Sequence, residues 1–467
     1  MTKRTIKRVH FIGIGGVGMS GIARIAHDQG MEVSGSDIKT NRYTTQLKDR
    51  GVKIFVGHDQ ENVLSQKPDV VVVSTAILEN NPELIAAKEH GIEVWHRAKM
   101  LAALGEGRKT LAVAGTHGKT TTSSMLASTL DGMGKDPTFL IGGAVHSYGT
   151  NAHSGESDLY VVEADESDKS FTYLSPYAIL VTNIEADHLD HYSNLEEIYG
   201  KFEEFIRSIP AEGICVVCGE DNELVEVAKA SGVNFFTYGF GDEYDISIRN
   251  YEPHGIGSDF ICSFPDGATV ATHIKQSPGR HNVLNGAGVL ALTWALGFSV
   301  EQAATHLAEF SGVRRRFDIV GEVDGIVIVD DYAHHPTEIE ATVAAANALD
   351  FDRVHVLFQP HRYSRAQLFT EILRDDFGKA FDLADTVTFM DVYPAGEMPL
   401  PGISGKTFMQ VILDHEGHPP VEYLPSLVEV APYFVDMLKS GDLLITMGAG
   451  DVTAIGPQIL DLLKQRK

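Results

Sequence analysis

The segment VAGTHGKTTT at 113–122 has the residue types and the spacing of a loop that binds phosphate. It follows an apolar run that predicts a strand, and it precedes a pattern that predicts a helix. In a P-loop of this kind, backbone N–H groups cradle the phosphates, the lysine meets the β- and γ-phosphates, and the next hydroxyl binds Mg²⁺. Lys119 and Thr120 hold those positions. The glycine usually found five residues before Gly118 is missing, and Gly115 stands nearby instead.

Acidic residues and histidines follow two further apolar runs, as EADESD at 163–168 and NIEADHLDH at 183–191. The carboxyl ends of parallel strands line the ligand crevice of an α/β sheet. A carboxylate and a hydroxyl suit Mg²⁺, which is a hard cation, and His188 is a candidate ligand for a second ion. Zinc at His188 and His191 is disfavoured because no cysteine and no helical HExxH motif accompanies them. A solvated acidic loop is the alternative interpretation.

The first strand pattern leads into GIGGVG at 13–18, and Asp37 ends the next strand pattern. This combination is typical of a dinucleotide-binding turn, in which glycine N–H groups and a helix N-terminus receive a pyrophosphate. NAD contains a diphosphate, and so does a UDP-sugar. The motif therefore predicts a diphosphate ligand and leaves these two open, beside the alternative of a tight turn without a ligand.

Two polar segments in the last third of the chain also follow strand patterns, DDYAHHPTE at 330–338 and QPHRYSR at 359–365. The second places Arg362 and Arg365 three residues apart, and a pair of guanidinium groups is a natural clamp for a carboxylate. Solvated surface arginines are the alternative. The turn GAGD at 448–451 is another candidate for ligand binding.

Length and composition are typical of a multidomain globular protein. At roughly 150 residues per domain, 467 residues predict about three domains. The net charge of −26 argues against binding to DNA or to an anionic membrane, and no run is apolar enough to span a membrane. The basic start is not a signal peptide, so we expect a cytoplasmic protein. Cys215 and Cys218 form a CxxC, but their apolar surroundings predict a buried strand rather than a redox site.

Apolar runs alternate with helical patterns along the chain, which predicts α/β domains with doubly wound parallel sheets. Boundaries are expected near 105–109 and 311–317. In the region 235–274, glycines and a proline break alternating strands into antiparallel hairpins appended to the middle domain. The expected strands include 9–14, 70–74, 110–114, 159–163, 178–182, 325–329, 354–358, 386–390 and 442–446, and the expected helices include 121–133, 282–297, 336–349 and 427–439.

Together these motifs resemble the Mur ligases. The resemblance rests on HFIGIGGVGMSGIA at 10–23, GSD at 35–37, GTHGKTTT at 115–122, EADESD at 163–168, ADHLDHY at 186–192, GRHNVLNG at 279–286, DDYAHHPTE at 330–338 and PHRYSR at 360–365. These motifs occur in order over essentially the whole chain. The first two are most similar to the branch that joins L-alanine to UDP-N-acetylmuramate. The branch that recycles murein tripeptide ranks second because its glycine loop differs.

The resemblance implies a UDP-sugar-binding Rossmann-like domain over 1–106, a central ATP-binding domain over 107–314 and a Rossmann-like amino-acid-binding domain over 315–467. The central domain would hold a parallel sheet and a small antiparallel sheet. The implied activity belongs to peptidoglycan precursor synthesis. The carboxylate of UDP-N-acetylmuramate takes the γ-phosphate of ATP, and the amine of L-alanine then displaces phosphate. The implied cofactors are ATP and two Mg²⁺ ions, with Mn²⁺ as an alternative. We expect no nucleic-acid or membrane partner, and a monomer or weak homodimer.

The family's functional residues map onto this chain by motif. Catalysis would involve Lys119, Glu163, His188, His334 and Arg362. ATP would be bound by Gly115, Thr116, His117, Gly118, Lys119, Thr120, Thr121, His281, Asn285, Arg316 and Asp331. The UDP-sugar would be bound by Gly13, Gly15, Gly16, Val17, Gly18, Met19, Ser20, Asp37, Ser74, Thr75, Ala76, His96 and Arg97. The amino acid would meet Tyr332, His334, His361, Arg362 and Arg365. Metal ions would be bound by Thr120, Glu163 and His188.

Two positions depart from the family pattern. Several Mur ligases support the second Mg²⁺ with a carbamylated lysine, but that position holds Glu203 here, which would serve as a plain carboxylate. Lys201 is close by, and carbamylation of Lys201 is the alternative. Relatives that add L-alanine also lack the lysine. Ala333 stands where many of those relatives carry glycine, and we expect little effect from it.

Two other function classes are alternatives to a ligase. An NAD-dependent oxidoreductase would use the glycine loop and leave the P-loop unexplained. A non-catalytic UDP-sugar sensor would not need Lys119, Glu163 and His188 intact. In a ligase, the nucleotide loop and the arginine pair lie on separate sheets, so we expect the C-terminal unit to close about a hinge near 312–317 and to exclude water from the acyl phosphate.

Overall fold

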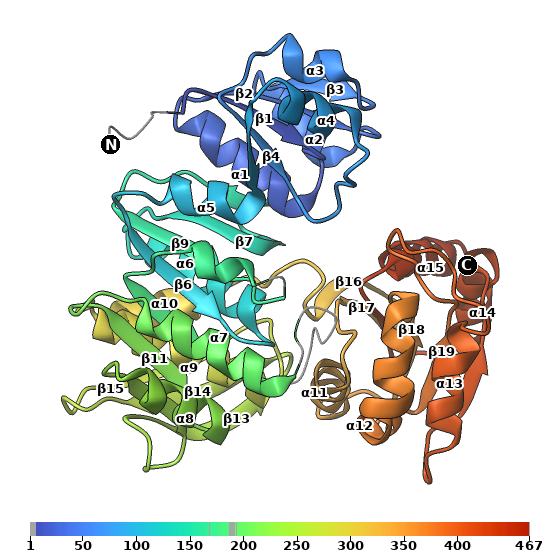
Figure 1. The fold of residues 1–467 in the computed structure, drawn as a ribbon. Coiled ribbons are helices and arrows are strands. Elements are labelled where there is room, and N and C mark those ends of the chain that lie inside the picture. The colour runs from blue at the N-terminus through green and yellow to red at the C-terminus, as the bar shows by residue number, and fades with distance from the viewer. Residues whose placement is uncertain (1–5, 168, 186–191, 193, 467) are drawn as a thin grey trace. The chain divides into compact units, whose positions relative to one another are not determined.

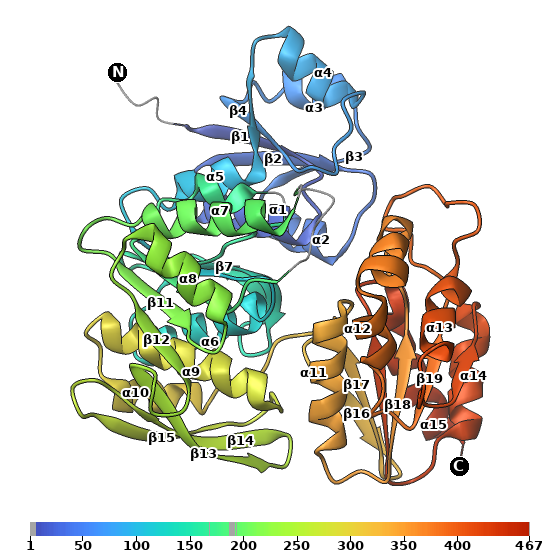
Figure 2. The same cartoon turned by 60° about the horizontal axis from the view of Figure 1, so that its bottom comes forward.

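The computed structural model describes residues 6–167, 169–185, 192 and 194–466. The chain divides into two compact units (Figure 1, Figure 2). The first comprises Met1–Arg249, Ile261–Ala271 and Leu284–Ala308, and the second comprises Asn250–Phe260, Thr272–Val283 and Glu309–Lys467. Within the described residues the strands form an N-terminal, a central and a C-terminal sheet. The predicted three-domain α/β fold is therefore confirmed.

The N-terminal sheet is parallel, with its strands in the order β3-β2-β1-β4-β5. Its elements are β1 (Arg8–Ile12), α1 (Val17–Asp28), β2 (Glu32–Asp37), α2 (Arg42–Asp49), β3 (Lys53–Val56), α3 (Gln60–Leu64), β4 (Val70–Val73), α4 (Pro82–Glu89), β5 (Glu93–His96) and α5 (Arg97–Leu104). Because β1 lies between β2 and β4, the winding reverses beside β1, and ligands of open α/β sheets bind at such a point.

Side-chain caps fix where the small helices of this sheet begin. Asn41 accepts hydrogen bonds from two N–H groups of α2, and Asp59 accepts one from α3. Asn81 caps α4, whose first residue is Pro82. Each cap satisfies N–H groups that have no partner within the helix, and each contributes about 1 kcal/mol.

In the central sheet the strands run β15-β14-β13-β12-β11-β10-β6-β9-β7-β8, and β6 pairs parallel with β9 and β10. Its elements are β6 (Lys109–Ala114), α6 (Lys119–Gly132), β7 (Thr138–Val145), β8 (Thr150–His153), β9 (Leu159–Glu163), η1 (Ser170–Tyr173), β10 (Ala178–Val181), α7 (Leu195–Arg207), β11 (Ile214–Cys218), α8 (Asn222–Ser231), β12 (Phe236–Phe240), β13 (Ile246–His254), β14 (Gly257–Ser263), β15 (Thr269–Ile274), α9 (Arg280–Ala295) and α10 (Val300–Leu307). The two acidic segments thus follow β9 and β10, the neighbours of the strand that leads into the P-loop.

The region 235–274 differs from the expected hairpins in two respects. β12 pairs parallel with both β11 and β13, so the reversals begin only after β13. The strands also extend the central sheet instead of forming a separate one. Glycines and a proline in the sequence locate the turns, but they do not determine which neighbour a strand pairs with.

The C-terminal sheet has the order β16-β17-β21-β18-β19-β20, and its edge strand β16 is antiparallel to β17. Its elements are β16 (Asp318–Val323), β17 (Ile326–Asp331), α11 (Pro336–Asn347), β18 (Arg353–Phe358), η2 (Tyr363–Arg365), η3 (Leu368–Ile372), α12 (Arg374–Lys379), β19 (Thr386–Phe389), α13 (Gly405–Leu413), β20 (Val421–Tyr423), α14 (Leu427–Met437), β21 (Asp442–Met447), η4 (Asp451–Ala454) and α15 (Ile455–Gln465). Alternate residues of β18 enter two cores. Val356 and Phe358 pack in one, and Leu357 packs in the other. Burial on both faces explains the continuous apolar runs.

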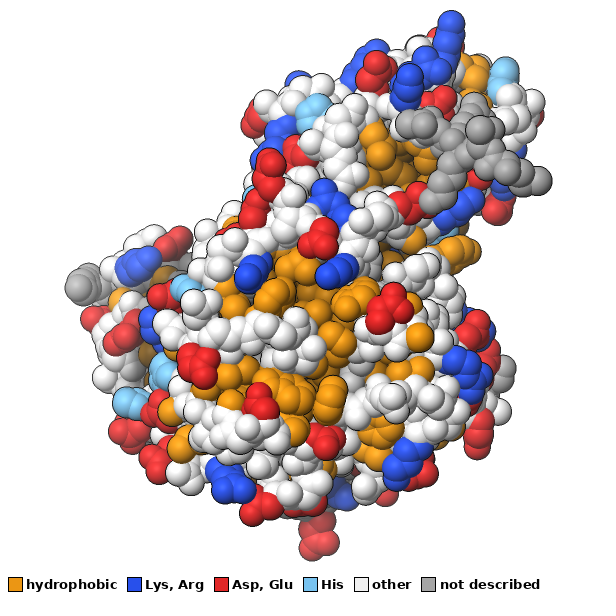
Figure 3. Space-filling model, turned by 90° about the vertical axis from the view of Figure 1, so that its left-hand side faces the viewer, with side chains coloured by type: hydrophobic (Ala, Val, Ile, Leu, Met, Phe, Trp, Pro, Cys, Tyr) orange, Lys and Arg blue, Asp and Glu red, His pale blue; other side chains and the backbone are white. Residues whose placement is uncertain are grey.

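Acidic and basic side chains are intermixed around exposed hydrophobic groups on the face drawn in Figure 3. The net charge of −26 is therefore not concentrated on that face. Among the helices of the described residues, none is both long enough and apolar enough to cross a membrane.

The CxxC lies on β11, and both thiols are buried, as the sequence predicted. Burial raises the pKa of Cys215 to about 12 and that of Cys218 to about 11. Three residues along a strand span roughly 10 Å, whereas a disulfide joins Cα atoms less than about 7 Å apart. The geometry opposes both thiolate chemistry and pairing.

We therefore expect these thiols to react slowly in the native protein. Labelling by Ellman's reagent should be at least about 100-fold slower than in urea, because only the exposed thiolate is nucleophilic. The urea-unfolded chain is the control for full reactivity. Rapid labelling of the native protein, or a Cys215–Cys218 disulfide after mild oxidation, would contradict this interpretation.

Candidate functional site

Two glycines give the P-loop its shape between β6 and α6. Gly115 has φ 134° and Gly118 has φ 81°, and backbone in this region favours glycine. A Cβ at Gly115 would lie 2.1 Å from Oγ1 of Thr182, so the loop also needs glycine to pass close to the end of β10. A Cβ at Gly118 would meet Oδ1 of Asn285 at 2.8 Å, which places Asn285 against the loop. Gly115 thus takes over the steric role of the missing glycine.

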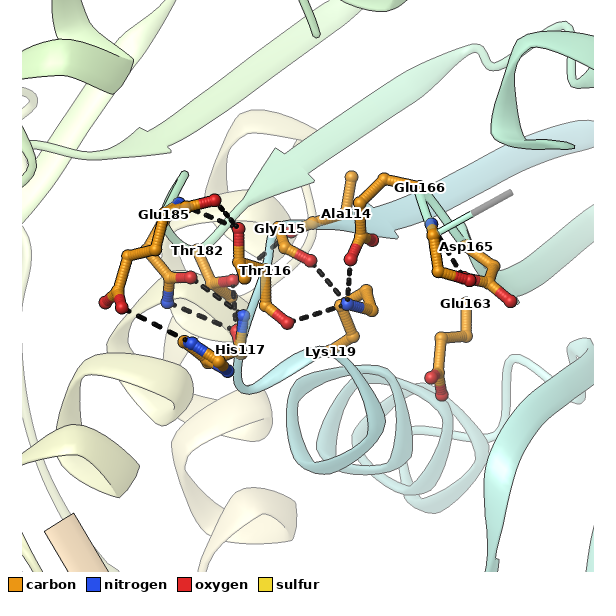
Figure 4. Close-up of polar contacts among 12 residues, drawn as sticks. Ala114, Gly115, Thr116, His117, Lys119, Glu163, Asp165, Glu166, Thr182 and Glu185 are labelled. Carbon is orange, nitrogen blue, oxygen red and sulfur yellow. Dashed lines mark hydrogen bonds and ion pairs between the residues drawn. The ribbon is translucent and has the colours of Figure 1, made fainter. Parts of the chain in front are cut away.

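Lys119, at the start of α6, points back across the loop (Figure 4). Its Nζ donates to the carbonyls of Gly115 at 2.6 Å and Thr116 at 2.8 Å, and to Oε1 of Glu166 at 2.8 Å. An ammonium group has three donors, so these contacts use all of them. Incoming phosphates must therefore replace at least one of these acceptors, and Glu166 competes directly with them.

Burial and the partner's charge shift the pKa in opposite directions for both members of this ion pair. Burial alone would lower the pKa of Lys119, but the charge of Glu166 and its hydrogen bond outweigh burial and raise it. Burial raises the pKa of Glu166 to about 7, although the charge of Lys119 acts in the opposite direction. The Lys119 side chain therefore stays protonated and positively charged. The role of Glu166 was missed from the sequence, although it lies within EADESD.

Thr120 and Glu163 form the part of the predicted metal site that the structure describes. The Thr120 hydroxyl donates to Oε1 of Glu163 at 2.9 Å, and the N–H of Gly142 donates to Oε2 at 2.6 Å. A Cβ at Gly142 would lie within 2.6–2.8 Å of both carboxylate oxygens and of the hydroxyl, so glycine keeps this cradle open. Hard oxygen ligands of this kind fit Mg²⁺. His188 lies outside the described residues.

The segment after β10 is tied to the other side of the P-loop. Asn183 accepts the N–H of His117 through its side chain at 2.8 Å and the N–H of Thr116 through its carbonyl at 3.0 Å. The N–H of Glu185 donates to the Thr116 hydroxyl at 2.8 Å, and His117 Nε2 lies 3.4 Å from the Glu185 carboxylate. The residues that follow Glu185 in the sequence, ADHLDH at 186–191, lie outside the described residues.

The candidates for the second metal's support lie on α7 with local partners. Glu203 pairs with Arg207 one turn later, and Lys201 Nζ lies 2.7 Å from Glu204. Neither pair involves Glu163 or the P-loop. The choice between Glu203 and Lys201 stays a prediction.

The N–H groups at the start of the glycine loop, residues 13–16, are hydrogen-bonded within the chain. The N–H groups of Gly13 and Ile14 donate to the Ser36 carbonyl at 2.8 and 3.0 Å, and that of Gly15 donates to Oδ2 of Asp37 at 2.8 Å. The N–H of Gly16 donates to the Gly13 carbonyl at 3.2 Å. The first turn of α1, residues 17–19, has no capping side chain among the described residues. Phosphate would therefore meet the first turn of α1, which includes the N–H of Gly18, rather than the N–H groups of Gly13, Gly15 and Gly16.

Arg97 connects this helix end with the acidic segment. Its Nη2 donates to Oδ2 of Asp165 at 2.7 Å, and a Cβ at Gly18 would lie 3.6 Å from its Nη1. Burial would raise the pKa of Asp165, but Arg97 outweighs it and holds the pKa well below its usual range. Gly18, Arg97, Gly142 and Glu163 line one cavity of about 160 Å³. Residues from the predicted sugar site and the predicted metal site therefore share a cavity.

The other predicted sugar-site residues lie at strand ends. Ser74, Thr75 and Ala76 follow β4. His96 ends β5, and its ring accepts the N–H of Ala98 at 3.4 Å and stacks on Tyr173 at 6.4 Å between centroids. His96 therefore acts as a helix cap in this structure.

Cations gather at the carboxyl ends of β17 and β18 in the C-terminal sheet. His361 stacks on Tyr393 with 5.8 Å between ring centroids and meets His334 edge-on at 5.9 Å. Burial, together with the positive charges of His334, Arg365, Arg362 and Arg315, lowers the pKa of His361 to about 3. Such a field suits a carboxylate ligand.

Arg315 is a further residue of this cluster that the sequence did not single out. Its Nη2 donates to the carbonyls of Gly448 at 2.5 Å and Gly450 at 3.3 Å, and its guanidinium lies 4.8 Å from the Tyr332 ring centroid. The candidate turn at 448–451 is thereby tied to the segment that enters this domain. Within that segment, Arg316 lies 5.2 Å from the same ring and 3.7 Å from Glu338.

Asp331 is turned into the protein, whereas the resemblance implies a role at the ribose of ATP. Oδ1 accepts the N–H of Ala333 and Oδ2 accepts the N–H of Phe317, both at 2.7 Å. Burial raises its pKa to about 6. These contacts make Asp331 the anchor of both neighbouring segments. His281 is partly buried, and this desolvation lowers the pKa of its imidazole to about 4.

Comparison with protein families matches three models in order along the chain: the Mur ligase family catalytic domain over 8–109, the Mur ligase middle domain over 113–293, and the Mur ligase glutamate ligase domain over 315–450. A UDP-N-acetylmuramate–L-alanine ligase of Carboxydothermus hydrogenoformans is 43% identical over 462 residues, which cover 98% of each chain. The crystal structure of a UDP-N-acetylmuramate–alanine ligase from Thermotoga maritima superposes with a TM-score of 0.83 at 28% identity, covering 99% of this chain and 100% of that one. A murein peptide ligase from Psychrobacter arcticus superposes with a TM-score of 0.73 at 26% identity, covering 98% of both chains.

Competition between Glu166 and the phosphates of ATP for the Lys119 ammonium group can be tested by substitution. Because Glu166 occupies a donor that phosphate needs, we expect Glu166→Gln to strengthen ATP binding without divalent metal about tenfold, or about 1.4 kcal/mol. Isothermal titration calorimetry measures this constant directly.

Glu204→Gln is the matched control, since it neutralises an exposed carboxylate on α7 that pairs with Lys201. It should leave ATP affinity unchanged. Weaker ATP binding by Glu166→Gln would show instead that this carboxylate supports the bound nucleotide.

Proposed function

This chain belongs to the Mur ligase family, and we propose that it joins L-alanine to UDP-N-acetylmuramate with conversion of ATP to ADP and phosphate. This is the first amino-acid addition in peptidoglycan precursor synthesis. Family membership favours a ligase over the NAD-dependent oxidoreductase and the non-catalytic sensor. The observation that carries the proposal is the cavity lined by Gly18, Arg97, Gly142 and Glu163, because it joins the anion-binding helix end to the carboxylate beside the P-loop.

The chemistry explains why both ends of that cavity are needed. A carboxylate is a poor electrophile, so its oxygen must first attack the γ-phosphorus of ATP, releasing ADP and leaving an acyl phosphate. The amine of L-alanine then attacks the carbonyl carbon, and the C–O bond to phosphate breaks. The first step brings two anions together, so positive charge must lie between them.

The residues of this chain divide that task. The N-terminus of α1 and Arg97 bind the diphosphate and direct the sugar's carboxylate toward Glu163. Lys119 leaves Glu166 and holds the β- and γ-phosphates. Thr120 and Glu163 would hold one Mg²⁺, which would supply positive charge against the phosphates, and His188 would hold a second. Its supporting group, Glu203 or carbamylated Lys201, is part of the same proposal.

The C-terminal domain supplies the amino acid. We assign the carboxylate of L-alanine to Arg362 and Arg365, with Tyr332, His334 and His361 around it, because cations gather there. His281, Asn285, Arg316 and Asp331 remain the proposed adenosine site. Proposed domain limits are 1–106, 107–314 and 315–467. We also propose a cytoplasmic location, a monomer or weak homodimer, and no nucleic-acid or membrane partner.

The segment 312–317 supports the proposed hinge. Gly312, Arg315 and Phe317 all have positive φ, with values of 86°, 63° and 47°. Phe317 belongs to the C-terminal core, and Arg315 holds the turn at 448–451. Residues from Arg315 onward therefore move with the C-terminal domain, and we place the pivot before Arg315.

Phosphate release tests the function directly. With ATP, Mg²⁺ and UDP-N-acetylmuramate, we expect release only when L-alanine is added, and not with D-glutamate or L-alanyl-γ-D-glutamyl-diaminopimelate. Lys119→Ala should lower the rate about 100-fold or more, because a charge aimed at the transferring phosphate is lost. Release only with the tripeptide would assign the recycling activity instead, and no release with any acceptor would contradict the ligase.

Closure about the hinge is testable in solution. We expect small-angle X-ray scattering to give a smaller radius of gyration when UDP-N-acetylmuramate and a non-hydrolysable ATP analogue are both bound than for the free protein. Identical profiles with and without both ligands would contradict closure.

A further inference from the structure

A charged side chain lies fully buried in the N-terminal domain, away from the cavity. Glu83, near the start of α4, has no exposed surface, and neither has its neighbour His10. The Glu83 carboxylate accepts hydrogen bonds from the Ser36 hydroxyl at 2.6 Å and from the Asn62 amide at 2.7 Å, and it lies 3.1 Å from Nε2 of His10. We call these residues, with His58 at 3.4 Å, the Glu83 cluster.

Burying a carboxylate costs several kcal/mol unless partners replace water. Burial would raise the pKa of Glu83, but the hydrogen bonds from His10, Ser36 and Asn62 outweigh it and lower the pKa. The group therefore stays ionised. Helix capping does not explain it, because Asn81 already accepts the N–H groups of Glu83 and Leu84 at 2.9 and 3.3 Å.

Ser36 leads from this cluster to the glycine loop. Its hydroxyl is held by Glu83, and its carbonyl receives the N–H groups of Gly13 and Ile14. The next residue, Asp37, receives the N–H of Gly15. Two adjacent residues of β2 thus fix the path of the loop that delivers the chain into α1.

We propose that Glu83 is a positioning residue for UDP-sugar binding: through Ser36 it holds the glycine loop so that the first turn of α1 faces the diphosphate. This inference rests on the proposed function. Glu83 touches no substrate, so its effect falls on the affinity for the nucleotide sugar. The chemical step at the γ-phosphate and the affinity for ATP depend instead on the P-loop residues and Glu163, which belong to the central sheet.

Glu83→Gln tests the proposal, because an amide cannot accept all the hydrogen bonds that the carboxylate accepts. We expect the KM for UDP-N-acetylmuramate to rise about tenfold, while kcat and the KM for ATP change less than about twofold. Ser36→Ala removes the hydroxyl through which Glu83 acts and keeps the carbonyl, so it should raise the same KM as well. It also provides a second variant should Glu83→Gln not fold.

Leu84→Ala is the matched control, since Leu84 is the next residue of α4 and packs in the apolar cluster with Ile12 and Val63. It should lower the Tm without changing the KM for UDP-N-acetylmuramate. An unchanged KM in folded Glu83→Gln would overturn the proposal. So would an equal rise of that KM in Leu84→Ala.

Hydrogen exchange of the free protein separates this inference from the proposed function. The amides of Gly13, Ile14 and Gly15 should exchange at least about tenfold faster in Glu83→Gln than in wild type, and at the wild-type rate in Leu84→Ala. Unchanged exchange in Glu83→Gln would overturn the inference. Faster exchange in a protein that does not use UDP-N-acetylmuramate would refute the proposed function and leave the link from Glu83 to the loop standing.

Discussion

Repulsion between anions is the constraint on which the site depends. The proposed reaction brings a carboxylate to a triphosphate in a protein with a net charge of −26, so its cations must lie where the anions meet. Strand ends meet this requirement, because parallel strands place loops and helix N-termini on one edge of a sheet. Lys119 follows β6, and Arg97 follows β5. Both are paired with carboxylates, Lys119 with Glu166 and Arg97 with Asp165.

Buried or partly buried carboxylates have a structural role at each of these edges. Glu83 holds Ser36 beneath the glycine loop, and Asp331 holds the backbone on both sides of its own strand end. The Glu163 carboxylate is held in place by hydrogen bonds from the N–H of Gly142 and from the Thr120 hydroxyl. A carboxylate accepts several hydrogen bonds in fixed directions, so it locks a loop more precisely than an apolar contact does. Acidic residues of this chain thus serve both as a proposed metal ligand, at Glu163, and as groups that fix the backbone of loops, at Glu83 and Asp331.

Much of this arrangement follows from sequence. Apolar runs in the sequence locate the strands. Because ligands bind at the carboxyl ends of parallel strands, the sequence alone predicts that Lys119, Thr120 and Glu163 lie together. The partners of individual polar groups do not follow in the same way. Asp37 bonds to Gly15, Glu166 occupies Lys119, and β12 runs parallel to β13. In each case several donors or strands lie near enough to be the partner. Which one pairs depends on the packing of residues that are far apart in the chain.

The central claim is that the carboxylate of UDP-N-acetylmuramate, held beside Glu163, itself attacks the γ-phosphate. Turnover of substrate labelled with ¹⁸O in that carboxylate, followed by mass spectrometry of the released phosphate, tests this directly. The account predicts that each phosphate carries one ¹⁸O atom, because the attacking oxygen leaves with phosphate when L-alanine displaces it. Unlabelled phosphate, with both labelled oxygens retained in the unligated sugar or lost to water, would contradict it.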